Sequence, residues 1–175
     1  MSITFLGLAT LFSFLLGFIL SLLIYKVGGK IYDLIMVIFL LPALSSRVAI
    51  SLIWRWMYQP TIGIINYFMR LIKLQGLSWL YDPNTALMSI LVVDIWQWAQ
   101  FLSLLIITAI RSLPSNILEA AEVDGASEIQ KIRYIMVPLL IPHFIGIIFI
   151  KALLSLRTFD LIWNMTRGGR VYPLK

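Results

Sequence analysis

Charged and aromatic residues that could bind a polar solute stand together in an apolar stretch around Asp94. Trp96 and Trp98 follow this aspartate closely. A carboxylate accepts hydrogen bonds from the hydroxyl groups of a solute, and an aromatic ring can stack on an apolar face of it. Phe159 and Asp160 form a second candidate pair, which the sequence does not separate from an ordinary helix end. Asp94 has an alternative use, because a charge in an apolar segment commonly belongs to an ion pair or reaches the membrane surface.

A second group of functional candidates lies in the charge-dense segment 119–138, which interrupts an otherwise apolar sequence. Pro114 suits the first turn of a helix, because its missing N–H would have no intrahelical partner there. Gly125 stands where a helix ends through a residue with positive φ. Ser127, followed three positions later by Gln130, has the form of a capping box. The segment therefore predicts two short helices joined by a glycine turn. Its alternative use is a solvated connector between two spans.

Residue usage excludes several kinds of chemistry. The chain has no cysteine and a single histidine, His143, so disulfides, thiolate metal sites and histidine-built metal sites are not expected. The stretch Gly28-Gly29-Lys30 lacks the first glycine and the hydroxyl residue of a phosphate-binding P-loop. His143 also has no Gly-x-Ser partner, which argues against an intramembrane serine protease. The 14 basic residues are scattered, so no nucleic-acid surface is expected. We expect no catalytic residue, metal or cofactor.

These candidate residues must be positioned by membrane helices. Hydrophobic residues make up 61% of the 175 residues, charged residues only 13%, and the mean hydropathy is +0.94. Soluble domains carry about 25% charged residues, so this composition is typical of a membrane protein. We expect an all-α membrane protein with about four transmembrane helices in a single domain over residues 1–175. The apolar stretches place the spans at about 4–25, 31–56, 85–110 and 137–156, with a polar loop at 111–136.

Charge does not fix the orientation of these spans, because the basic residues divide between the two sides. The stretch at 4–25 is predicted to be a span rather than a signal peptide. No basic residue precedes it, and it exceeds the apolar core of about 7–15 residues that a signal peptide has. Arg47, Arg55 and Lys151 lie in or near the apolar stretches and are expected to extend to lipid headgroups.

The polar loop resembles the EAA loop of permease subunits in binding-protein-dependent ABC importers. The residues that match the family pattern are Glu119, Ala120, Ala121, Asp124, Gly125, Ala126, Ile135 and Pro138. Four further segments, at 54–60, 79–84, 94–98 and 159–162, resemble the carbohydrate-uptake branch of these permeases. Two segments depart from the pattern. Ala99-Gln100 stands where Thr-Pro is common, and residues 166–170 replace the usual Thr-Gly-Gly-Gly-Pro.

This resemblance implies a type I ABC importer permease fold, with the loop in the cytoplasm of a prokaryotic cell and the spans in its inner membrane. The matching loop residues, together with Ser127, would contact a separate ABC ATPase, so the chain itself is not expected to be an enzyme. A substitution such as Gly125→Asp is then expected to uncouple ATP hydrolysis from uptake. The other partners implied are a second permease subunit, an extracytoplasmic solute-binding protein and a sugar or polyol. Asp94, Trp96, Phe159 and Asp160 are candidates for the substrate path.

The extent of the resemblance leaves other functions open. Members of the family usually have one more span before and one more after the matching region, so the chain looks like the middle of a permease. It could therefore be a truncated or non-functional permease remnant. A fragment of a secondary transporter is a further alternative, although such a protein has no use for an EAA loop. The sequence identifies neither the sugar nor the partner permease.

Overall fold

The computed structural model describes residues 3–156 and 159–166, with the side chains of residues 83, 84 and 159 excepted. The described residues form helices and connecting turns without any strand, which confirms the predicted all-α class. In chain order the helices are α1 (Ile3–Ile24), α2 (Gly29–Leu44), α3 (Arg47–Met57), α4 (Ile64–Leu71), α5 (Pro83–Arg111), α6 (Ser115–Val123), α7 (Glu128–Lys131), a π-helical turn (Ile132–Met136), α8 (Val137–Ser155) and α9 (Phe159–Thr166).

Three helical segments in the described part of the chain are long and apolar enough to cross a membrane. They are Ile3–Ile24, Thr85–Arg111 and Glu128–Ser155. The first two agree with the predicted spans at 4–25 and 85–110. The third begins earlier than the predicted span at 137–156, because α7 continues through the π-helical turn into α8 without a break. The short helix at the end of the polar loop is therefore a direct extension of a membrane helix.

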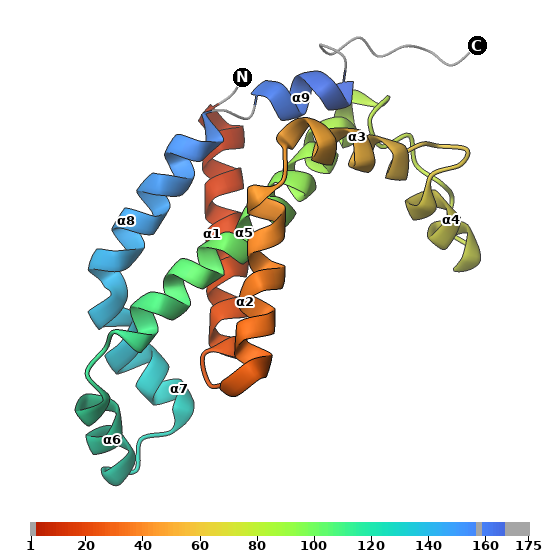
Figure 1. Cartoon of the computed structure of the whole chain (residues 1–175). Helices are drawn as coiled ribbons and strands as arrows, with labels where there is room; N and C mark the ends of the chain where they lie inside the picture. The colour runs from red at the N-terminus through yellow and green to blue at the C-terminus, as the bar shows by residue number, and fades with distance from the viewer. Residues whose placement is uncertain (1–2, 157–158, 167–175) are drawn as a thin grey trace.

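The predicted span at 31–56 is not one straight helix. α2 and α3 meet at a bend of 93° after Leu44, so this pair forms at most one broken span. Pro42 lacks the N–H that would continue the helical ladder. The hydroxyl of Ser45 donates to the carbonyl of Leu41 at 2.8 Å, and Ser45 itself is extended. α3 then lies across one end of the bundle beside α9 (Figure 1).

α1 and α5 make the most extensive helix contact in the structure. The buried face of α1 repeats small residues every fourth position, at Ala9, Ser13, Gly17 and Ser21. Small side chains at this spacing let two membrane helices approach closely. At Gly17 the approach is at its limit, because an added Cβ would lie 2.8 Å from the carbonyl oxygen of Ala99. α5 thus becomes the central helix, with α1, α2 and α8 packed around it.

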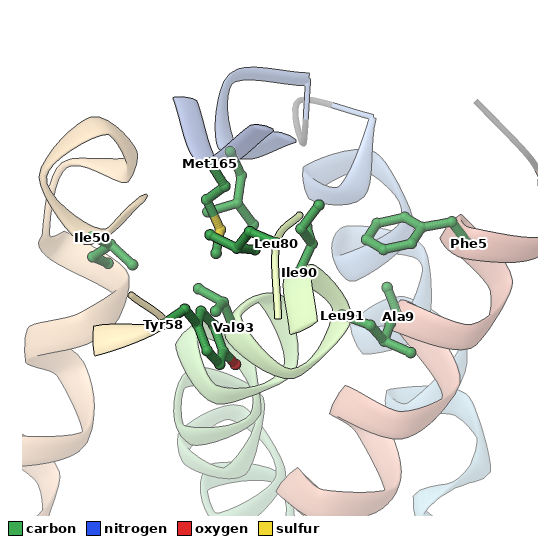
Figure 2. Packing of buried hydrophobic residues seen from close by; sticks show 10 residues of the cluster. Phe5, Ala9, Ile50, Tyr58, Leu80, Ile90, Leu91, Val93 and Met165 are labelled. Carbon is green, nitrogen blue, oxygen red and sulfur yellow. The ribbon is translucent and has the colours of Figure 1, made fainter. Parts of the chain in front are cut away.

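Two hydrophobic clusters fill the space between these helices. One cluster lies near the α3–α9 end and is shown in Figure 2, where Met165 of α9 and Leu80 lie over Ile90 of α5, and Phe5 and Ala9 approach from α1. The other cluster lies towards the α6–α7 end and centres on Leu102, Ile106, Met136 and Leu140. Many apolar side chains on the outer faces of the long helices are exposed, as expected for helices that face lipid.

The two ends of the bundle differ. α6 protrudes beyond the turn that joins α1 to α2, at the bottom of Figure 1, and α7 lies beside that turn, whereas α3 and α9 lie at the opposite end, from which α4 extends to the side. We refer to these as the α6 end and the α9 end.

Candidate functional site

The polar loop at the α6 end contains the predicted helix, glycine turn and second helix. α6 ends at Val123, and Gly125 has φ of +79°, as the sequence predicts. The N–H of Ala126 donates to the carbonyl of Ala121 at 2.9 Å, and that of Gly125 donates to Glu122 at 3.0 Å. This pair of hydrogen bonds is the Schellman arrangement, which satisfies carbonyls left open at a helix end. Pro114 precedes α6 as its N-cap residue rather than lying within its first turn.

The second helix of the loop starts with the predicted capping box. The N–H of Ser127 donates to Oε1 of Gln130 at 2.7 Å, and the N–H of Gln130 donates to Oγ of Ser127 at 3.4 Å. Pro138 does not end this helix, because the helix continues through the π-helical turn and past Pro138 into α8. Both helices of the loop are therefore fixed by their own caps, and the second is fixed to a membrane span.

Lys131 joins the two helices of the loop electrostatically. Its ammonium lies 2.6 Å from Oε1 of Glu122 in α6 and 2.5 Å from Oε1 of Glu128 in α7. The lysine side chain is only 8% exposed, although both carboxylates are partly in solvent. A lysine held between two carboxylates restrains α6 relative to α7. The loop is thus a small structured unit rather than a floppy connector.

Most of the predicted coupling residues lie on the surface of this loop. The exposed ones are Glu119, Ala120, Asp124, Gly125, Ser127 and Pro138, while Ala126 and Ile135 are half-buried. Ala121 is buried at 8% exposure, so it does not lie on the open face beside Ala120. Its carbonyl also accepts the hydrogen bond from the N–H of Ala126 that closes α6.

The loop also exposes apolar side chains that the sequence pattern did not single out. Val123 is 87% exposed, Ile129 76% and Tyr134 67%. These three side chains are available for contact with another protein. In the sequence these apolar residues stand between charged ones. The direction in which their side chains point could not be predicted, because it depends on the turn at Gly125.

A second polar cluster is buried between α5 and α8. Nζ of Lys151 lies 2.6 Å from Oδ2 of Asp94, and it donates to Oγ of Ser155 at 2.8 Å. Both charged side chains are inaccessible, at 0% and 1% exposure. The indole of Trp98 lies beside this pair, with its ring centre 6.0 Å from Nζ of Lys151. A buried charge is tolerated only with such partners.

Two expectations about membrane charges are therefore wrong. Lys151 does not extend to the headgroups, because Asp94 neutralises it inside the bundle. Arg47 also turns inward: Nη2 donates to the carbonyl of Leu154 at 3.0 Å, and the guanidinium lies 5.2 Å from the ring centre of Trp98. The sequence does show one acidic residue, Asp94, and one basic residue, Lys151, in two apolar spans. Whether they pair depends on the rotation of each helix about its axis, which the sequence does not give.

The four candidates for a substrate path do not form one site in the described structure. Asp94 faces α8, whereas Trp96 lies on another side of α5 and packs edge-on against Trp54 at 5.5 Å. Asp160 is exposed on α9, and its carbonyl accepts a hydrogen bond from Asn164. The side chain of Phe159 lies outside the described residues. Only Asp94 lies within the buried polar cluster.

Three polar atoms of this cluster have no hydrogen-bond partner among the described residues. They are Oδ1 of Asp94, Oε1 of Gln97 and Nε1 of Trp98, all on α5. The amide nitrogen of Gln97 lies 3.4 Å from the carbonyl of Pro42, at the bend between α2 and α3. Buried polar atoms without partners are uncommon in folded proteins, so these three atoms are free to bind a polar solute or water.

An aromatic hollow at the α9 end is less suited to bind a sugar than the polar cluster around Asp94. It has a volume of about 390 Å³ and is lined by Trp54, Tyr58, Trp79 and Ser89, among others. The hydroxyl of Ser89 donates to backbone carbonyls, and Nε1 of Trp79 donates to Asn66 at 2.8 Å. An apolar hollow with its polar groups already engaged suits hydrocarbon better than a hydroxylated ring. The described residues also hold no cluster of side chains that could bind a metal ion.

Comparison with known proteins places this arrangement in a family. Residues 3–171 match the sequence model of the binding-protein-dependent transport system inner membrane component. The chain belongs to this family. Its members are components of the inner membrane, in agreement with the apolar helices.

Individual relatives agree with this membership. A probable ABC transporter permease from Pyrococcus horikoshii is 35% identical over 159 residues, which cover 90% of this chain and 54% of the relative. The trehalose/maltose transport system permease MalF of Thermococcus litoralis is 30% identical over 132 residues, or 75% of this chain and 45% of the relative. The chain spans about half of the length of these two relatives.

Solved structures show the same fold. A bacterial alginate ABC transporter, in complex with an alginate pentasaccharide-bound periplasmic protein, superimposes with a TM-score of 0.81 at 26% identity. The match covers 93% of this chain and 60% of the transporter chain. The predicted type I ABC importer permease fold is thereby confirmed for the inner-membrane component described here.

Proposed function

We propose that the chain is the membrane-spanning part of an ATP-driven, binding-protein-dependent importer, and that it receives mechanical work through the loop at the α6 end. The observation that carries this proposal is the loop itself. It is capped at both helices, held together by Lys131 and continuous with a membrane span. A rigid unit that protrudes from the lipid can transmit a displacement, which a flexible connector cannot.

The partner on this loop is an ABC ATPase subunit in the cytoplasm. The surface offered to it combines Glu119, Ala120, Asp124 and Ser127 with the exposed side chains of Val123 and Ile129. Among these, Ala120 lets a partner approach the backbone of α6 closely. ATP hydrolysis then takes place on the separate subunit. The α6 end is cytoplasmic in this proposal, and the α9 end faces the solute-binding protein.

The transported solute is a sugar or polyol, carried between this chain and a second permease subunit. Relatives named for trehalose/maltose and for xylose/arabinose transport support this substrate class. Within the chain, the buried cluster around Asp94 is the best-supported part of the path, since Asp94, Gln97 and Trp98 keep uncommitted polar atoms there. Trp96, Phe159 and Asp160 remain proposed contributors nearer the α9 end.

Transport measurements in liposomes test this function. The importer containing this chain is reconstituted with its ATPase, its second permease subunit and its solute-binding protein, and uptake of the sugar selected by the isolated binding protein is followed. Uptake is expected only when ATP and the binding protein are both present. Flux driven by an ion gradient without the ATPase would contradict the proposal and favour a secondary transporter. Failure of all uptake with a fully assembled complex would favour a non-functional remnant.

A further inference from the structure

One carboxylate, that of Glu128, joins the loop at the α6 end to the turn between α1 and α2. Its Oε1 pairs with Lys131 within the loop. Its Oε2 lies 2.6 Å from Nζ of Lys26 and accepts a hydrogen bond from the hydroxyl of Tyr25 at 3.0 Å. Tyr25 and Lys26 directly follow α1. Glu128 therefore connects two segments that are 103 residues apart in the sequence.

Both donors on the turn keep their protons at neutral pH. Burial and the hydrogen bond to Glu128 raise the pKa of Tyr25 above its ordinary value, and the hydrogen bond to Glu128 raises the pKa of Lys26. The ordinary values are already about 10, so the phenol remains a donor and the ammonium remains charged. The contact therefore persists over the physiological pH range.

The same turn is held from its other side by α5. Nη2 of Arg111, at the end of α5, donates to the carbonyl of Val27 at 2.8 Å. Its guanidinium also lies 3.5 Å from the ring centre of Tyr32 in α2. Figure 1 shows this turn beside α7 at the lower end of the bundle. Any displacement of the turn is consequently shared by α1, α2 and the end of α5.

We propose that Glu128 is a positioning residue that transmits displacement of the loop to α1 and α2 directly, in addition to the continuous route along α8. The inference rests on the proposed coupling role of the loop. The connection runs from Glu122 in α6 through Lys131 to Glu128 and on to Lys26. Half-exposed ion pairs add little to folding stability. Their effect here is to restrict the motion of the loop relative to the turn.

A distance measurement with spin labels tests this role. The chain contains no cysteine, so Gly28→Cys on the turn and Asn116→Cys in α6 give two specific labelling sites in it. The distance between the labels is measured in the assembled importer, without nucleotide and after trapping with Mg-ATP and vanadate. The test variant combines Tyr25→Phe with Lys26→Met, which removes both contacts to Glu128 and keeps the ion pairs inside the loop. Lys26→Arg and Lys30→Met serve as the conservative and the neighbouring controls.

With the native residues and in both controls, we expect the same label distance before and after trapping, because the loop and the turn move together. In the double variant we expect the distance to shift by several ångström on trapping and its distribution to broaden. A native distance that changes on trapping, or a double variant that behaves like the native chain, overturns the role of Glu128. A crosslink between Ser127→Cys and the ATPase distinguishes failure of this inference from failure of the proposed function. If the crosslink forms but the double variant gives the native label distances, only the role of Glu128 is refuted. If the crosslink does not form, the coupling role of the loop is refuted as well.

Discussion

The buried ion pair between Asp94 and Lys151 is the residue-scale feature with the largest energetic consequence. Removing one partner leaves an uncompensated charge in the bundle, which costs about 3–5 kcal/mol in comparable buried pairs. We therefore expect Asp94→Asn and Lys151→Met each to lower the stability of the chain by roughly this amount. The Asp94→Asn/Lys151→Met double variant should recover most of the loss. Thermal unfolding of the native chain, the two single variants and the double variant in lipid nanodiscs measures these stabilities.

The same variants separate a structural role from a transport role. If Asp94 also lies on the substrate path, the stable double variant should still transport poorly in the liposome assay. If the double variant is both stable and fully active in transport, Asp94 has a structural role only. Additive losses in the double variant would mean that the two side chains do not interact.

Gly125 is the residue at which backbone conformation decides the shape of the loop. Its φ is +79°, and no atom lies within 4 Å of the position that a Cβ would take. A substitution there is strained through the backbone alone. Valine disfavours this conformation, whereas asparagine adopts it more readily. We expect an importer carrying Gly125→Val to hydrolyse ATP on its ATPase subunit without uptake, and one carrying Gly125→Asn to retain most of the coupling. The ratio of sugar imported to ATP hydrolysed is the readout.

Equal coupling in Gly125→Val and Gly125→Asn would show that the left-handed turn is not needed. The comparison is a close one, since both side chains point into open space and differ chiefly in backbone preference.

At the scale of helices, the close approach of α1 to α5 sets the arrangement of the bundle. An alanine at position 17 would place its Cβ 2.8 Å from a backbone oxygen of α5 and 3.1 Å from Cβ of Leu102. Overpacking of this kind costs about 1–3 kcal/mol. We expect Gly17→Ala to be destabilising by that amount in nanodiscs.

Gly7→Ala on the same helix provides the matched control, because nothing lies within 4 Å of its Cβ position. Alanine is the better helix former by about 1 kcal/mol, so this variant should be neutral or slightly stabilising. Similar unfolding temperatures for the two variants would contradict the packing described for α1 and α5.

The sequence predicted those parts of the helices that depend on local signals. The glycine turn, the capping box at Ser127 and the long helices over the apolar stretches at 4–25 and 85–110 are encoded by neighbouring residues, and each is present in the structure. The bend after Leu44 was missed, because a proline within an apolar run bends some membrane helices only slightly. Ser45, which completes the break, acts through a hydrogen bond that hydropathy does not report.

At the scale of the whole molecule, the membrane class, the permease fold and the family were predictable because several motifs occur in the right order. Which side chains meet between helices was not predictable. The pairing of Asp94 with Lys151, the inward turn of Arg47 and the burial of Ala121 all depend on the rotation and depth of packed helices.

The central claim is that the loop at the α6 end contacts an ATPase, and crosslinking tests it most directly. Ser127 and Ala120 are exposed on the loop, whereas Thr61 is exposed at the α9 end and serves as the control. In the assembled importer, Ser127→Cys and Ala120→Cys are expected to form crosslinks to the ATPase subunit that change in yield between the nucleotide-free and the ATP–vanadate states. Thr61→Cys should form none. Crosslinks from Thr61→Cys, or none from either loop position, would contradict the account.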